Sequence, residues 1–285
     1  MKVAVLGSLT RDYIVISNRN ERYTQAGGGA YYSSSALASL GVDVCCFPLL
    51  SQKDKELLVE LEHPKIKIIP QWTAETTVYR NIYHTNSLDD CNKEILSRAR
   101  DYKIDKETLE VIRACDAVHL VPLSSDEFSI NTYHELRKRY NKLVGLDGQG
   151  FTKFQIDNLG SALTGNIDIL KLDDMEILQI TSSKEELAAV DKLKSWGVSE
   201  ILVTKASQGS VIYVGKDSYV ILPAPALKIV DTTGCGDAYM AGYLVGRLSK
   251  HSPEKSALFA SKVAAKNLEF RGAIKVDLSS WVKNI

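Results

Sequence analysis

Alternation between short apolar runs and helix-like segments most restricts how this chain of 285 residues folds. Along most of the sequence, a helix-like segment separates one strand-like run from the next. This repeat predicts a parallel sheet with helices on both faces. The buried runs include 2–6, 117–121, 143–146, 167–172 and 200–204. We therefore expect an α/β fold with a doubly wound, mostly parallel sheet.

Two stretches, 13–25 and about 68–87, contain strand-like runs without helices between them. In the second, Thr76–His84 alternates enough to have one exposed face. We expect the two stretches to form a small β-sheet lid, although edge hairpins of the main sheet would give the same pattern. Because the chain shows no second period of alternation and no low-complexity linker, we expect one domain over residues 1–285.

Charge and composition argue against several kinds of partner. Lys plus Arg equals Asp plus Glu at 35 each, so no net charge attracts nucleic acid or a membrane surface. No apolar run approaches the roughly 20 residues of a membrane-spanning helix. The first residues form a strand rather than a signal peptide, and the five cysteines include no Cys-x-x-Cys pair. We expect a cytoplasmic protein that binds neither nucleic acid nor membrane.

The motif Asp-Thr-Thr-Gly-Cys-Gly-Asp at residues 231–237 predicts an anion site. Gly234 and Gly236 allow a sharp turn that exposes successive N–H groups at the start of a helix, where the helix dipole favours an anion. Asp237 follows at once and places a carboxylate beside these N–H groups. Phosphoryl transfer to a hydroxyl needs such a cradle with an adjacent base. The simpler interpretation is a helix entry with an acidic first turn. Cys235 needs only its backbone here, although a thiol at a helix N-terminus is also a candidate nucleophile.

Other polar residues follow the predicted strands, at the edge of a parallel sheet where ligands gather. Each alone is typical of a cap or turn, but their shared placement indicates a site. They are Asp12, Gly27–Gly29, Asp147, Gln149, Asp173, Glu176 and Thr204. The sequence lacks the P-loop motif, the third glycine of Gly-x-Gly-x-x-Gly, the His-Glu-x-x-His motif and the Gly-x-Ser-x-Gly elbow. These absences argue against P-loop nucleotide hydrolases, dinucleotide oxidoreductases, zinc proteases and serine hydrolases.

The 231–237 motif resembles the Asp-Thr-x-Gly-Ala-Gly-Asp signature of the ribokinase-like (PfkB-type) carbohydrate kinases, with Cys235 in place of alanine. The resemblance continues in order along nearly the whole chain. Gly27-Gly28 and the following helix resemble the family's glycine-pair motif, and Asp12 falls where the family has a sugar-binding aspartate. Residues 147–151 resemble an Asp-x-Gln-Gly loop of some members. Asp173 and Glu176 resemble the Asn-x-x-Glu motif, with aspartate in place of asparagine.

This resemblance implies a transferase that phosphorylates a hydroxyl of a small carbohydrate or polyol with ATP. It implies that Asp237 is the base and that the amides of Gly234, Cys235 and Gly236 form the anion hole. Further roles are implied for acceptor binding by Asp12, Gly27, Gly28 and Tyr32, for nucleotide binding by Thr204, Gly209 and Asn267, and for Mg²⁺ binding through water by Glu176 and Asp173. A monovalent cation near Asp231 is a further candidate cofactor, and the lid edge is a candidate homodimer contact.

Tyr32 departs from the family pattern, because sugar kinases commonly have an asparagine nine residues before the glycine that matches Gly41. An aromatic ring there changes the acceptor pocket, unless Tyr31 and Tyr32 only pack in the core. The departure favours an inositol-type acceptor or a nucleoside over ribose or fructose. Two other interpretations stay open at this point: a nucleotide-binding relative without turnover, which would not need Asp237, and an oxidoreductase.

Overall fold

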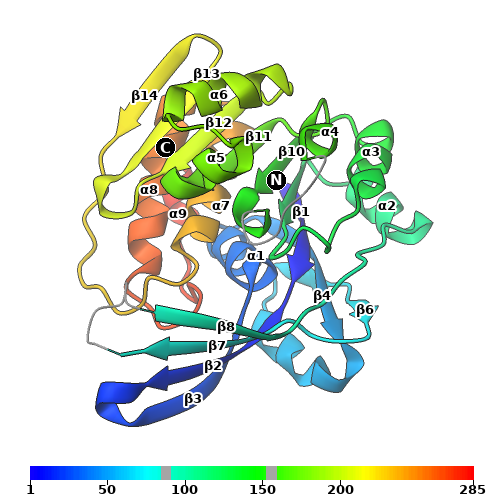
Figure 1. Cartoon of the computed structure of the whole chain (residues 1–285), viewed down its shortest axis with the longest axis vertical. Helices are drawn as coiled ribbons and strands as arrows, with labels where there is room; N and C mark the ends of the chain where they lie inside the picture. Colours follow the sequence, from blue (N-terminus) through cyan, green and yellow to red (C-terminus); the bar gives the residue numbers. More distant parts are fainter. Residues whose placement is uncertain (85–90, 152–158) are drawn as a thin grey trace.

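Two β-sheets organise the computed structural model, which describes residues 1–84, 91–151 and 159–285 (Figure 1). The larger sheet has the strand order β14-β13-β12-β11-β10-β9-β1-β4-β5, and β6 also pairs with β4. Every pair from β5 to β12 is parallel, whereas β13 and β14 are antiparallel. The strands are β1 (Lys2–Ser8), β4 (Asp43–Ser51), β5 (Ile66–Ile68), β6 (Gln71–Thr73), β9 (Ala117–Val121), β10 (Leu143–Asp147), β11 (Ile169–Asp173), β12 (Glu200–Thr204), β13 (Ser210–Val214) and β14 (Asp217–Ile221). The predicted doubly wound, mostly parallel sheet is confirmed.

Helices cover both faces of this sheet because its central strands are apolar on both sides. In β1, Val3 and Val5 face one helical layer, and Ala4 and Leu6 face the other. The first layer contains α1 (Gly29–Ser39), α7 (Cys235–Leu248) and α8 (Pro253–Asn267), with the short α9 (Ser279–Val282) beside it. The second contains α2 (Lys106–Arg113), α3 (Ile130–Arg139), α4 (Leu159–Leu163), α5 (Asp174–Thr181) and α6 (Glu186–Ser195). Short 3-10 segments are η1 (Ser17–Arg19), η2 (Gln52–Leu61), η3 (Gly148–Gly150) and η4 (Ala206–Gln208).

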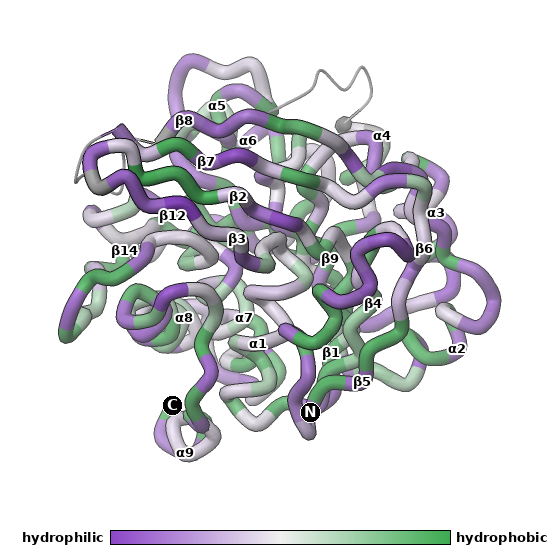
Figure 2. Tube along the Cα trace, turned by 90° about the horizontal axis from the view of Figure 1, so that it is seen from below, coloured by the Kyte–Doolittle hydropathy of each residue, from purple (hydrophilic) through white to green (hydrophobic). Residues whose placement is uncertain are grey.

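The smaller sheet, called the lid below, has the order β3-β2-β7-β8 and projects from one end of the larger sheet (Figure 1). Its strands are β2 (Thr10–Ile16), β3 (Glu21–Gly27), β7 (Val78–Tyr83) and β8 (Cys91–Ser97). Hydrophilic and hydrophobic stretches both occur along these strands, as Figure 2 shows. This mixture is typical of a sheet with one face turned to solvent.

The expected lid stretches differ from the observed ones at two places. Residues 68 and 71–73 of the second stretch belong to the larger sheet instead, where β5 and β6 pair with β4 along its parallel edge. Strand β8 was missed because Cys-Asn-Lys-Glu-Ile-Leu-Ser is largely polar, as suits the edge of a lid. The end of the second stretch, 85–87, lies outside the described residues. Within the described chain, no helix combines the length and apolarity that a membrane crossing requires.

A partly buried ion pair fixes α7 on the larger sheet. Arg247, near the end of α7, donates to both carboxylate oxygens of Glu200 in β12, with Nη2 at 2.8 Å from Oε1. The hydroxyl of Tyr243 donates to the same carboxylate at 2.6 Å. Because these bonds tie the C-terminal half of α7 to β12, they also set where its N-terminus lies.

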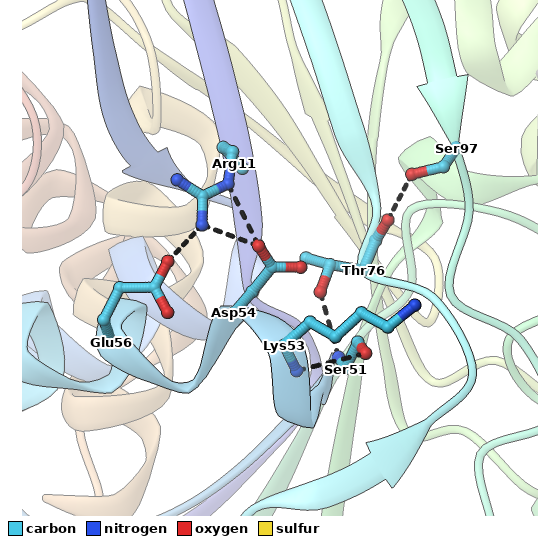
Figure 3. A network of polar contacts seen from close by, with 7 residues as sticks. All are labelled: Arg11, Ser51, Lys53, Asp54, Glu56, Thr76 and Ser97. Atoms are coloured by element: carbon cyan, nitrogen blue, oxygen red, sulfur yellow. Dashed lines mark hydrogen bonds and ion pairs between the residues drawn. The ribbon is translucent and has the colours of Figure 1, made fainter.

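A polar network at the base of the lid joins it to the larger sheet (Figure 3). Arg11 of β2 forms ion pairs with Asp54 and Glu56 of η2, at 2.6 Å for Asp54. Thr76, which precedes β7, accepts from the Ser51 amide at 2.9 Å, and its hydroxyl bonds to Asp54. Its carbonyl accepts from Ser97 at 2.5 Å. Thr76 therefore connects the edge strand β8, and through Asp54 and Arg11 also β2, to the end of β4.

Replacing the buried Thr76 by valine should lower the free energy of unfolding by about 1–3 kcal/mol, because the Ser51 amide and Asp54 lose a partner while the shape is kept. Chemical denaturation checks this. The exposed Thr24→Val in β3 is the matched control, with a change within about 0.5 kcal/mol. Equal effects of the two substitutions would contradict the role given to Thr76.

Candidate active site

The N-terminus of α7 forms the floor of the site. Gly234 is the N-cap, with a φ of 77°, and the first intrahelical bond runs from the Ala238 amide to the Gly234 carbonyl at 2.9 Å. The amides of Gly236 and Asp237 precede that bond and have no acceptor within the helix, whereas the Cys235 amide donates to the Thr232 carbonyl at 3.4 Å. This turn carries the positive end of the helix dipole. It is called the cradle below, and its use as an anion site stays a prediction.

Helix α8 and the preceding turn hold this cradle in place. The Asp231 carboxylate accepts from the Thr233 amide at 2.9 Å. The buried Asn267 amide donates to the Thr233 carbonyl at 2.9 Å and to the Cys235 sulfur at 3.6 Å. Cys235 donates to the Ala264 carbonyl at 3.7 Å, and burial raises the pKa of its thiol to about 11. The thiol is therefore protonated at neutral pH, which argues against its use as a nucleophile.

Both cradle glycines allow close contacts that a Cβ atom would block. At Gly234, a Cβ would lie 2.1 Å from the ring of Tyr32 in α1, so this ring lies directly against the turn. At Gly236, a Cβ would lie 2.6 Å from the ammonium nitrogen of Lys171 in β11. The cradle therefore has an aromatic ring on one side and a cation on the other.

A cavity of about 260 Å³ opens above the cradle. The larger sheet and its helices supply most of its wall, and the lid supplies the rest. Its lining residues are Thr10, Asp12, Gly28, Gly29, Tyr32, Tyr79, Asn81, Tyr83, Lys93, Leu123, Asp147, Gln149, Lys171 and residues 232–237. Strands β1, β10 and β11 end beside it, as expected for ligand sites at the carboxyl edge of a parallel sheet.

Asp237, in the first turn of α7, is 7% exposed and lines this cavity. Ser33 of α1 lies 3.5 Å away and donates to its Oδ1. Burial, followed by the negative charge of Asp147, raises the pKa of Asp237 to about 7, although Lys171, Ser33 and Lys93 oppose the shift. A carboxyl with this pKa exchanges a proton readily near neutral pH.

Lys171 and Asp147 form a buried ion pair next to Asp237, with 2.6 Å between Nζ and Oδ2. Burial alone would lower the pKa of Lys171, but the carboxylates of Asp147, Glu176 and Asp237 raise it above its usual value. The pair is therefore charged. His119 of β9 is fully buried nearby, and burial lowers its pKa to about 4, so its ring is neutral.

Asp173 and Glu176 form a capping box at the start of α5. The Asp173 carboxylate accepts from the Glu176 amide at 2.6 Å, and Glu176 accepts from the Asp173 amide at 2.8 Å. Burial raises the pKa of Glu176 to about 7 against the field of Lys171. Among the described residues, no three His, Cys, Asp or Glu side chains enclose a metal site.

Comparison with known proteins assigns the chain to a family. A comparison of sequence families matches residues 1–280 to the pfkB family carbohydrate kinase. The chain belongs to this family. It is therefore a phosphotransferase.

Individual relatives of this kinase act on different acceptors. The ribokinase of Arabidopsis thaliana is 28% identical over 174 residues, which are 59% of this chain and 45% of that protein, so the alignment spans less than half of the relative. The cytidine kinase of Thermococcus kodakarensis is 24% identical over 86% of this chain and 88% of its own. A solved pyrophosphate-dependent kinase with a pyrophosphate analogue and myo-inositol has a TM-score of 0.81 at 23% identity over the whole of both chains. That structural likeness shows the ribokinase-like fold.

The kinase brings most of the residues predicted for catalysis and acceptor binding to one cavity. Asp12 is buried beside it and accepts from the Thr10 hydroxyl at 2.7 Å. A Cβ at Gly27 would lie 2.3 Å from this carboxylate, so Gly27 packs on Asp12 rather than lining the cavity. Gly28 and Tyr32 do line it. The Tyr32 ring contacts Gly234, so its position combines packing with a place in the pocket wall.

The residues predicted for the nucleotide and the metal lie outside the cavity wall. Thr204 at the end of β12 donates to the Leu172 carbonyl at 3.3 Å. At Gly209, where φ is 91°, a Cβ would lie 2.1 Å from the Ile221 carbonyl oxygen, so this glycine serves the β12–β13 turn. Asn267 braces the cradle, and Asp173 and Glu176 cap α5. In this conformation, the side chains of Thr204, Asn267, Asp173 and Glu176 form hydrogen bonds with other groups of the protein.

Several lining residues of the kinase escaped sequence reasoning although a signal was present. Tyr79, Asn81 and Tyr83 line the cavity at a period of two along β7, which is the alternation of one strand face. Lys171 stands out as a lysine within an apolar strand that ends at the site. Lys93 carried no such signal, because it comes from a polar strand that was not predicted.

Lys171→Met should lower the free energy of unfolding by about 3–5 kcal/mol, because the buried Asp147 loses its counter-charge. The double variant Asp147→Leu with Lys171→Met should recover most of that loss, since no unpaired charge remains. Denaturant titration measures both, with the exposed Lys184→Met as control. A single variant as stable as the control would show that the pair is not charged.

Proposed function

We propose that this kinase transfers the terminal phosphoryl group of ATP to a hydroxyl of a small carbohydrate or polyol. The observation that supports this most directly is the placement of Asp237 beside the α7 amides within one cavity. In this proposal the Asp237 carboxylate accepts a proton, and the α7 amides hold an anion. A phosphorylated alcohol is the product that this combination favours.

In this proposal, the acceptor hydroxyl lies against Asp237, which takes its proton as the new O–P bond forms. The bond between the transferred phosphorus and the bridging oxygen of ATP breaks, and ADP leaves with that electron pair. The amides of Gly234, Cys235 and Gly236 hold the negative charge on the transferred group. The Lys171 ammonium, beside Gly236, adds a fixed positive charge. Such preorganised charges stabilise a loose transition state without a nucleophilic side chain.

Asp12 and Tyr32 bind the acceptor in this proposal, while Gly27 and Gly28 set the chain path beside Asp12. The cavity of about 260 Å³ lies just below the roughly 300–1,000 Å³ of typical drug-sized sites. Its size therefore favours an acceptor of monosaccharide or inositol dimensions. A nucleoside, which the Thermococcus kodakarensis relative's name suggests, would need more space on the acceptor side.

Mg²⁺ is proposed as the partner of ATP, with water between the ion and the side chains of Glu176 and Asp173. The residues fit such an ion, since Mg²⁺ keeps several waters and needs only one or two carboxylates beside the donor phosphates. Glu176 supplies one carboxylate near Lys171. Bound there, Mg²⁺ would neutralise charge on the phosphates. Thr204, Gly209 and Asn267 are proposed to border the nucleotide.

Three further points of the sequence hypothesis stay proposals of the same kind. The single domain over 1–285, a monovalent cation near Asp231 and a homodimer through the lid edge are consistent with the fold but need separate tests. Analytical ultracentrifugation measures the oligomeric state. ATP consumption in potassium against sodium buffers measures the cation dependence.

The proposed function is tested by ATP consumption over sugars, polyols, sugar acids and nucleosides, with pyrophosphate as a second donor. Asp237→Asn should lower kcat on any active acceptor by about 10²-fold or more, because the amide cannot take the proton. Asp191→Asn, an exposed position on α6, is the control and should keep wild-type turnover. Near-normal turnover of Asp237→Asn would remove Asp237 from the role of base.

The pH profile gives a second test of the base. Asp237 must be deprotonated to accept the proton, so kcat/KM should fall as the pH drops through a limb with an apparent pKa near 7. Asp147, Lys171, Lys93 and Ser33 face this carboxyl and set the position of the limb. The pH profile of the residual rate of Asp237→Asn should not show this limb. A limb that persists in the variant would belong to another group, such as Glu176.

A further inference from the structure

The lid places two neighbouring polar side chains over the cavity. Asn81 of β7 and Lys93 of β8 are direct cross-strand partners, and both line the cavity wall. Directly paired residues of antiparallel strands point to the same face. The next pair along, Arg80 with Glu94, points the other way and forms an exposed ion pair at 2.9 Å. Lys93 thus presents its charge to the cavity rather than to the outer face of the lid.

Asn81 and the exposed Lys93 each have a polar atom without a partner among the described residues. Asn81 is 4% exposed, and its Oδ1 has no hydrogen-bond partner within the described residues. Lys93 has no carboxylate within ion-pair distance in the same part of the chain. The hydroxyl of Tyr32, on the opposite wall, is also buried without a described partner. A ligand between these groups would find two donors, the Lys93 ammonium and the Tyr32 hydroxyl, and one acceptor, the Asn81 carbonyl oxygen.

Of the two lysines that line the described cavity wall, one already has a close counter-ion. The Lys171 ammonium is paired with Asp147 at 2.6 Å, and the Asp12 carboxylate is held by the Thr10 hydroxyl. Lys93 forms no ion pair within the described chain, although its positive charge reaches Asp237 and lowers the pKa of that carboxyl. A neutral acceptor that filled the cavity would take this ammonium out of water without replacing its hydration, which is costly. An acceptor that carries a carboxylate would offset this cost, because its negative charge would pair with the ammonium.

The transferred phosphoryl group already has its counter-charges on the opposite wall, where the α7 amides and Lys171 lie. The lid pair belongs instead to the acceptor side, because β7 pairs with β2, the strand that carries Asp12. We propose that Lys93 binds a carboxylate on the acceptor while the Asn81 carbonyl oxygen accepts from a neighbouring hydroxyl of the same molecule, so that this kinase prefers sugar acids to neutral sugars. The inference rests on the proposed function, because it assigns the acceptor of the same site.

Kinetics with matched acceptors tests the subsite: D-gluconate against D-glucitol, and D-glucuronate against D-glucose, at saturating ATP. The acid of each pair should have the higher kcat/KM. Lys93→Gln should lower kcat/KM for the acid by about 10- to 100-fold more than for its neutral partner, chiefly through KM, because the lost field on Asp237 affects both acceptors alike. Lys93→Arg should keep the preference. Arg80→Gln, on the outer face of the same strand pair, is the control and should change neither acceptor.

Binding without ATP separates this inference from the proposed function. D-gluconate should raise the Tm of the wild-type protein more than D-glucitol does, and Lys93→Gln should abolish the difference. Acid-specific binding without turnover would support the subsite and contradict the kinase assignment of these acceptors. Turnover of neutral acceptors alone would overturn the subsite and leave the kinase intact. An equal loss for acid and neutral acceptors in Lys93→Gln would also overturn it, because it would place Lys93 on the transferred phosphoryl group.

Discussion

The buried ion pair between Lys171 and Asp147 is the interaction on which the rest of the site depends. It joins the ends of β10 and β11 and places a permanent cation under the N-terminus of α7. Without that cation, Asp237, Asp147 and Glu176 would be three buried carboxyls in one region, and their mutual repulsion would favour protonated forms. With it, Asp237 keeps a pKa near 7 rather than a much higher one. The ion pair thus supports the anion cradle and the candidate base together.

The helical layer that contains α1 and α7 also shapes the site, because small side chains on α1 allow the two helices to pack closely. Helix α1 is buried along its whole length, and its Ala-Tyr-Tyr-Ser-Ser-Ser-Ala run lets it lie against α7. Ser33 then reaches Asp237, and the Tyr32 ring reaches Gly234. A bulkier α1 would separate these contacts. Close helix packing is therefore part of the site geometry, not only of stability.

Sequence reasoning predicted the parts of this molecule that follow from local rules. The doubly wound sheet follows from apolar runs such as 117–121, and the cradle follows from two glycines before an acidic first turn. Long-range pairing is not local, so the chain gave no sign that 66–68 joins β4 or that β8 pairs with β7. The placement of Lys93 follows only from that second pairing. For the same reason, the bracing role of Asn267 appears only when α8 is packed against the cradle.

The two walls of the cavity differ in what a mutation can change. The phosphoryl wall is built largely from backbone amides at the start of α7, which substitutions of side chains leave in place. The acceptor wall is built from side chains on β7 and β8, where one exchange alters charge or shape without disturbing the larger sheet. The lid is tied to that sheet through Arg11 and Thr76 at its base, outside the cavity lining. A fold arranged in this way keeps one transfer chemistry while its acceptor changes. Under the proposed function, the choice of acceptor therefore depends on lid side chains such as Asn81 and Lys93.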